Sequence, residues 1–195
     1  LEEAQKIEAY LKTHCGGHIR AAYGCSLGGS FVGLLAARQN IHMDYGILGS
    51  SDLDQASPLA ASLQTDFLLP FIYPVVRDGK IKAKFLQKCL DKCAKESRDY
   101  VKAFLKMFGD ARPYVTMQSC KNQFYSDLIT PLPDKIHIPG TEIHIFYALK
   151  MGKKYRACYQ RHFAHPVLHE QNLQHEELLA CYPGQWAQLV KSIAL

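Results

Sequence analysis

Residues 18–30 read HIRAAYGCSLGGS, and this stretch decides the fold. Its first six residues are mostly apolar and run up to Gly24, which is typical of a short buried strand. The next five fit the pattern G-x-S-x-G, and an apolar helical pattern follows them. A turn that lifts a serine above a sheet is tight, so we expect Gly24 and Gly28 to be required for steric reasons. The stretch predicts a strand, a sharp turn with Ser26 as nucleophile, and a helix whose first amide, that of Leu27, is an oxyanion donor.

The elements on either side of this stretch predict an α/β fold. A helical pattern precedes it and stops at Gly16-Gly17, and a second short strand is predicted over 44–48. Strand, helix and strand in succession favour parallel pairing, with helices packed on the sheet. A strand over 142–148, an extended run over 166–173 and a last helix from near Pro183 continue the pattern.

Between the second and third predicted strands, the sequence changes to amphipathic helices separated by proline and glycine. We therefore expect a helical cap over 57–135, inserted in a core made of 1–56 and 136–195. Cys89 and Cys93 are one helical turn apart, and we expect them to share a buried face.

Composition indicates a soluble globular enzyme, with 48% apolar and 21% charged residues. The net charge of +5 is concentrated over 77–106, where ten Lys or Arg oppose four Asp or Glu. No nucleic-acid motif accompanies this segment. Its regularly spaced lysines are expected to be a solvated face, with an anionic substrate or a membrane surface as the alternative; they are Lys80, Lys84, Lys88 and Lys92.

The cysteines and the lack of long apolar runs predict a cytoplasmic protein. The seven cysteines form no CxxC pair, and no Cys/His cluster has zinc spacing, so we expect reduced thiols and no metal. No window approaches 18 uninterrupted apolar residues and no basic leader is present, so neither membrane insertion nor export is expected.

A serine nucleophile needs a base, and nine histidines are available. His175 differs from the others because it stands just after the last predicted strand and before a helix. The other eight are expected to be surface or packed imidazoles.

Taken together, these features resemble the second half of an α/β-hydrolase. The similarity rests on Ser26 in its turn, the strand and helical insertion that follow, a further strand, and then His175. Residues 175–179, followed by Tyr182-Pro183 and Trp186, resemble the histidine loop and last helix of small esterase- or lipase-like members. The resemblance implies a Ser–His–acid triad that acts on a small acyl substrate through an acyl-enzyme, without a cofactor. A non-catalytic binding protein on the same fold and an acyltransferase are the alternatives.

The sequence departs from this family in two places. After the strand at 142–148, where the acid most often stands, residues 149–154 contain no carboxylate. The alternative position, after the strand at 44–48, offers Asp52 and Asp54; we choose Asp52, although a loop or capping role is an even alternative. Family members also carry three or four strands before the first helix, one of which precedes a loop that donates the second oxyanion N–H. We therefore expect a complementary N-terminal segment.

Overall fold

The computed structural model describes residues 2–53 and 55–195, and in them four strands form one parallel sheet in the order β1-β2-β3-β4. This confirms the predicted α/β class and all four strand positions. The predicted strands at 18–23 and 44–48 are each slightly longer in the structure. The bounds are His18–Cys25 for β1, His42–Gly49 for β2, Glu142–Ala148 for β3 and Val167–Gln171 for β4.

The register of the sheet brings all four carboxyl ends to one edge. His18 lies opposite His42 where β1 and β2 begin, and Cys25 lies opposite Gly49 where they end. The end of β2 then lies opposite Phe146 in β3. In parallel α/β sheets this edge is where ligands bind, because the loops that follow the strands converge there.

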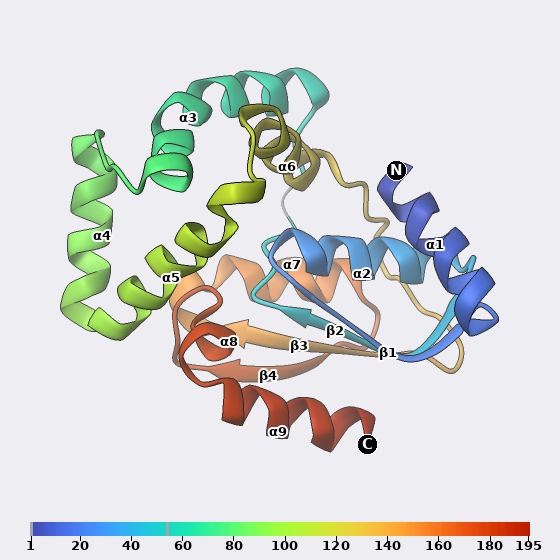
Figure 1. Ribbon diagram of the computed structural model, residues 1–195. Coiled ribbons are helices and arrows are strands. Elements are labelled where there is room, and N and C mark those ends of the chain that lie inside the picture. The colour runs from blue at the N-terminus through green and yellow to red at the C-terminus, as the bar shows by residue number, and fades with distance from the viewer. Residues whose placement is uncertain (1, 54) are drawn as a thin grey trace.

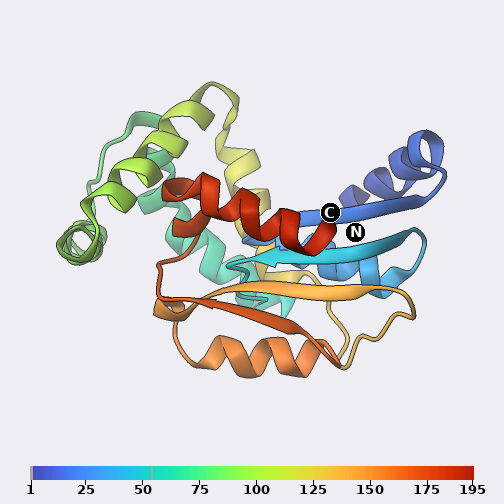
Figure 2. The same ribbon diagram turned by 90° about the horizontal axis from the view of Figure 1, so that it is seen from below.

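Helices cover both faces of the sheet (Figures 1 and 2). On one face lie α1, α2 and α7, and the main core between them and the sheet includes Leu48, Ile145 and Tyr159. The other face packs on α9 through a smaller core around Ile47 and Phe146. The bounds are Glu2–Cys15 for α1, Leu27–Arg38 for α2, Lys154–His162 for α7, Glu177–Cys181 for α8 and Pro183–Ala194 for α9.

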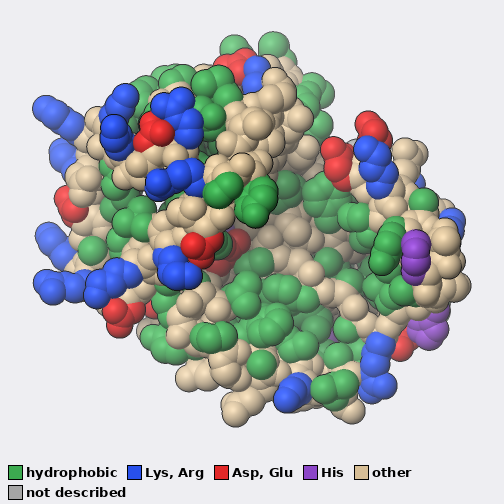
Figure 3. Space-filling model, in the orientation of Figure 1, with side chains coloured by type: hydrophobic (Ala, Val, Ile, Leu, Met, Phe, Trp, Pro, Cys, Tyr) green, Lys and Arg blue, Asp and Glu red, His purple; other side chains and the backbone are tan. Residues whose placement is uncertain are grey.

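The chain between β2 and β3 forms four helices that lie beyond the carboxyl edge of the sheet (Figure 1). They are α3 (Pro58–Asp78), α4 (Lys84–Glu96), α5 (Arg98–Ala111) and α6 (Met117–Ile129). Short 3₁₀ turns follow α5 at Arg112–Tyr114 and β3 at Leu149–Met151. We call α3 to α6 the cap. Lys and Arg side chains gather over α4 and α5 (Figure 3).

The expectation that Cys89 and Cys93 share a buried face is wrong. No residue of α4 is buried, and Cys89 is exposed. Both cysteines line an open cavity inside the cap instead, together with Leu86 and Leu90. Helical periodicity identifies the apolar side of α4, but the depth of that side depends on how the neighbouring cap helices pack.

Helix α3 is long and apolar enough to cross a membrane by length and composition alone. Its 21 residues contain an 18-residue window of mean hydropathy 1.4, of which 28% is buried. The sequence criterion of uninterrupted apolar residues did not detect it, because polar residues interrupt the run. A single helix of this kind does not establish a membrane span, and α3 packs against α5 and α6 within the cap.

Candidate active site

Ser26 stands on a strained turn between β1 and α2. Its backbone has φ 52° and ψ −124°, a conformation that few non-glycine residues adopt. Three hydrogen bonds hold it: the Ser26 N–H donates to the Gly49 carbonyl at 2.9 Å, and the Ser26 carbonyl accepts from the Gly29 N–H and the Ser51 hydroxyl, both at 2.9 Å. Strain of this kind costs about 1–3 kcal/mol, and it persists where the surroundings enforce it.

Two glycines make this turn possible, Gly24 and Gly29. Only Gly24 is one of the two glycines that the G-x-S-x-G motif led us to expect. A Cβ atom on Gly24 would overlap the carbonyl group of Gly28, and one on Gly29 would overlap the Ser51 hydroxyl. A Cβ on Gly28 would meet nothing within 4 Å. The expectation that Gly28 is needed for steric reasons is therefore wrong, because the close approach of α2 to the loop after β2 falls one residue later.

The carboxyl edge of the sheet brings the predicted site residues into one region. Ser26 follows β1, Asp52 follows β2 and His175 follows β4. Of the nine histidines, only His175 follows the carboxyl end of a strand directly. The others lie in α1 or α7, at strand starts, within strands, or in the segments that lead into β3 and β4.

No hydrogen bond joins Ser26, Asp52 and His175 to one another. The Ser26 hydroxyl and the Leu27 N–H have no hydrogen-bond partner among residues 2–53 and 55–195. His175 Nε2 lies 3.7 Å from a carboxylate oxygen of Glu176, and its side chain is 33% exposed. Asp52 Oδ1 is buried and unpaired. The structure thus gathers the three residues at one edge without linking them.

The loop that carries His175 is fixed by its neighbours. The Gln174 N–H donates to the Glu177 carboxylate at 2.7 Å, and the Glu177 N–H donates to the Gln174 carbonyl at 3.2 Å. Glu177 is only 3% exposed, so this reciprocal pair is shielded from water. In addition, the Lys150 N–H donates to the Leu173 carbonyl at 3.2 Å, which ties the loop after β3 to the loop after β4.

A carboxylate from the cap joins these two loops. Glu96, the last residue of α4, accepts a hydrogen bond from the Gln174 side chain at 2.9 Å. It also pairs with Lys150 Nζ at 3.2 Å. Lys150 belongs to the segment after β3 where an α/β-hydrolase most often has its acid. Here that segment anchors the cap beside His175.

Cys25, next to Ser26, is not a competing nucleophile. Burial, and then the nearby Glu176 carboxylate, raise the pKa of the Cys25 thiol to about 12. Only the thiolate is nucleophilic, so Cys25 stays unreactive near neutral pH. The same influence means that Glu176, the residue after His175, lies beside the residue before Ser26. The sequence analysis did not identify this position of Glu176, although the His-Glu-Glu run at 175–177 places it directly after His175.

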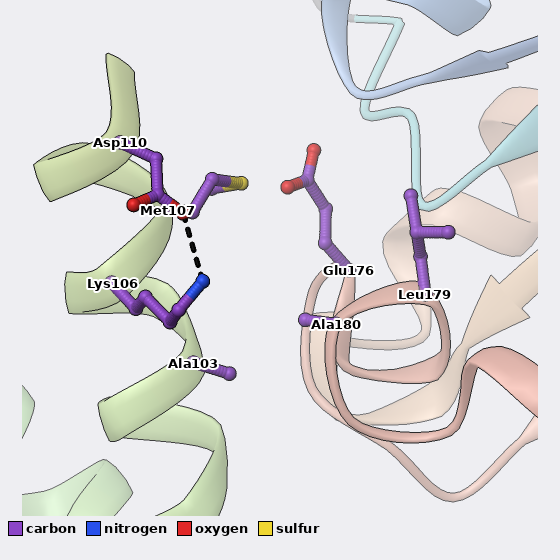
Figure 4. Close-up of a pocket in the computed structure, with 7 residues that line it drawn as sticks. All are labelled: Ala103, Lys106, Met107, Asp110, Glu176, Leu179 and Ala180. Carbon is purple, nitrogen blue, oxygen red and sulfur yellow. Dashed lines mark hydrogen bonds and ion pairs between the residues drawn. The ribbon is translucent and has the colours of Figure 1, made fainter.

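One cavity of about 280 Å³ lies between the cap and the His175 loop. Figure 4 shows the Glu176 carboxylate pointing across it toward α5, where Lys106 pairs with Asp110 at 2.9 Å. Its lining residues are Ala103, Lys106, Met107, Asp110, Glu176, Leu179 and Ala180.

A second cavity, of about 380 Å³, lies inside the cap and has an almost wholly apolar lining. Tyr100 lines it and is only 8% exposed. Burial raises the pKa of Tyr100 to about 12, with smaller contributions from groups that include Cys93 and Glu176. Helix α5, which carries Tyr100, packs against α8 directly after the His175 loop. The other lining residues are Ile72, Val75, Leu86, Cys89, Leu90, Cys93, Val101, Phe104, Phe108 and Phe124.

Comparison with solved structures establishes the class: the chain has the α/β-hydrolase fold. A protein from Desulfitobacterium hafniense described as an α/β-hydrolase family member superposes with a TM-score of 0.71 at 16% identity, over 98% of this chain and 75% of that one. A marine microorganism esterase gives 0.62 at 14% identity, over 98% and 76%. A thermophilic esterase from Thermogutta terrifontis gives 0.60 at 16% identity, over 94% and 68%. No protein-family profile and no curated protein sequence matches the chain.

Proposed function

We propose that the chain is a serine hydrolase that cleaves a carboxylic ester, or a similar acyl bond, through an acyl-enzyme on Ser26. The observation that carries this proposal is the strained backbone of Ser26, held by three hydrogen bonds on a strand-to-helix turn. Backbone strain enforced at a serine in this position has no evident structural purpose, and such strain is concentrated at functional sites.

In this mechanism the Ser26 hydroxyl attacks the acyl carbonyl carbon while His175 takes its proton as general base. The resulting oxyanion accepts a hydrogen bond from the unpaired Leu27 N–H. His175 then protonates the departing alcohol, and water activated by the same imidazole releases the acid. Asp52 holds the imidazole in the correct tautomer and stabilises its cationic form.

Two features support these roles. Glu176 lies beside Cys25, which brings the residue after His175 close to the residue before Ser26. Catalytic hydrogen bonds are often long in unliganded enzymes, so the missing Ser26–His175 bond is compatible with catalysis. Asp52 has a buried, unpaired oxygen, and a buried acceptor of this kind is costly unless a donor such as an imidazole completes it.

The cap cavity supports a substrate with an apolar acyl chain. Its lining is apolar, and α5, which carries Tyr100, packs against α8 directly after the His175 loop. A chain bound there would be removed from water, which favours binding by about 0.8 kcal/mol per buried methylene.

Covalent labelling tests the proposal. A fluorophosphonate probe should label the chain once, and peptide mapping should place the label on Ser26. Ser26→Ala should abolish labelling with little change in stability, whereas Ser192→Ala, at an exposed serine in α9, should label normally. Labelling of Ser26→Ala at the parent rate would show that another residue reacts.

The acid is tested by paired substitutions. Asp52→Asn should lower the acylation rate by about 10⁴-fold, because the imidazole loses the anion that orients it. Asp54→Asn, at the other candidate, which lies outside the described residues, is the matched control. If only Asp54→Asn lowers the rate, the acid is Asp54; if neither does, no triad operates through this loop.

Two alternatives to hydrolysis have different readouts. A non-catalytic binding protein is favoured by the pairing of Lys150 with Glu96 where an acid is usual, and it would bind an acyl compound without being labelled. An acyltransferase would be labelled at Ser26 but would transfer its acyl group to an added alcohol or thiol faster than to water.

A further inference from the structure

Two histidines and an aspartate meet on the surface where β1 and β2 begin, at the end of the sheet opposite Ser26. The parallel register places His18 directly across from His42. Because side chains alternate along a strand, Asp44 lies on the same face as His42. The three are 24 and 2 residues apart in sequence, so only strand pairing brings them together. Histidine side chains are visible at this end of the molecule in Figure 3.

The donor atoms of this cluster are close enough to hold one ion. His18 Nε2 lies 2.8 Å from Asp44 Oδ1, and His42 Nε2 lies 3.5 Å from the same oxygen. All three donor atoms lie within 4.8 Å of one another. Zinc bonds of about 2.0–2.2 Å at tetrahedral angles need donors roughly 3.3–3.5 Å apart. Small movements of side chains that are 39–60% exposed satisfy this spacing.

We propose that His18, His42 and Asp44 form a zinc site that links the amino ends of β1 and β2. Two imidazoles and one carboxylate suit zinc, and the fourth position is left for water or another donor. The site is separate from the candidate active site. Its effect would be structural, because the ion would fasten β1, an edge strand of the described sheet, to its neighbour.

Arg20 carries a positive charge that disfavours a cation at this site, and this gives the proposal a further test. It is two residues from His18 on β1 and therefore faces the same side of the sheet. Its Nε donates to the Ala194 carbonyl, and its charge acts on Asp44. Arg20→Gln should therefore bind zinc more tightly than the parent chain, because a fixed positive charge next to the ion is removed.

Isothermal titration of the chelator-treated, reduced 195-residue chain with zinc chloride tests the site. We expect one ion per chain in the parent. His18→Ala, His42→Ala and Asp44→Asn should each lower the affinity at least about 100-fold, since even the loss of outer-shell partners costs 10–100-fold. Zinc should raise the Tm of the parent but not that of His18→Ala/His42→Ala.

The matched control is His137→Ala/His165→Ala, which removes another exposed histidine pair, with ring centroids 6.1 Å apart. This control should bind zinc like the parent. With cobalt in place of zinc, the absorption spectrum should lack a thiolate charge-transfer band, because no cysteine is a ligand. Parent-like affinity in His18→Ala/His42→Ala, loss of binding in the control, or a thiolate band would each overturn the proposal.

Discussion

At the scale of single residues, the turn at Ser26 depends on which of its neighbours can carry a Cβ atom. Gly24 and Gly29 cannot, because the carbonyl group of Gly28 and the Ser51 hydroxyl occupy the space. Gly28 can. The Ser51 hydroxyl near Gly29 also donates to the Ser26 carbonyl, so crowding at Gly29 would disturb a bond that holds the serine.

This difference predicts opposite results for two adjacent substitutions. Gly29→Ala should lower the free energy of unfolding by about 1–3 kcal/mol, because Ser51 must move to admit the methyl group. Gly28→Ala should be neutral or stabilising by up to about 1 kcal/mol, because alanine is the better helix residue. Urea unfolding of both variants measures this difference. Equal destabilisation would show that Gly28 is also crowded.

Sequence identified the serine turn correctly but not its packing. The G-x-S-x-G pattern located Ser26 because the backbone geometry of the turn is local to five residues. The contact between Gly29 and Ser51 depends on a loop more than twenty residues away, and no local pattern contains it. The pairing of His18 with His42 escaped detection for the same reason.

At the scale of elements, Glu96 makes one of the contacts between the cap and the core. It links the end of α4 to Lys150 after β3 and to Gln174, the residue before His175. The helices of the cap and the strands of the core could be predicted from periodicity. The placement of the cap helices relative to the core could not be predicted from periodicity. It depends on partly exposed polar pairs, and on a cavity that leaves α4 without a buried residue.

Glu96→Ala should affect function more than stability. The pair is partly exposed, so its loss should cost at most about 1 kcal/mol. If the proposed hydrolase mechanism is correct, acylation of Ser26 should nevertheless slow, because Gln174, the residue before His175, loses its hydrogen bond to Glu96. Thermal unfolding and the rate of fluorophosphonate labelling measure the two effects.

Asp91→Ala is the control for this prediction, because it removes an exposed carboxylate whose hydrogen bond from Gln87 lies within α4. It should leave the labelling rate unchanged. A parent-like labelling rate in Glu96→Ala would mean that the cap contact does not position His175.

At the scale of the whole molecule, β1 is an edge of the described sheet, since β2 is its only strand partner there. An unpaired strand edge presents free N–H and C=O groups to other chains. We therefore expect the 195-residue chain to self-associate as its concentration rises.

Ala21→Lys should reduce this association. Ala21 is exposed in the middle of β1, and a lysine there would add charge where a second chain would pair. Light scattering across a concentration series measures the apparent mass. A parent chain that stays monomeric throughout the series would show that the edge is already protected.

The raised pKa of the Cys25 thiol affects how the residue next to Ser26 reacts with oxidants and alkylating reagents. Burial raises the pKa of this thiol to about 12, so the thiolate is a minor form at pH 8. Peroxide and alkylating compounds react with thiolates, so both should leave this residue largely unmodified. Oxidants would then modify the exposed Cys15 and Cys89 first, and the residue next to Ser26 would stay unmodified.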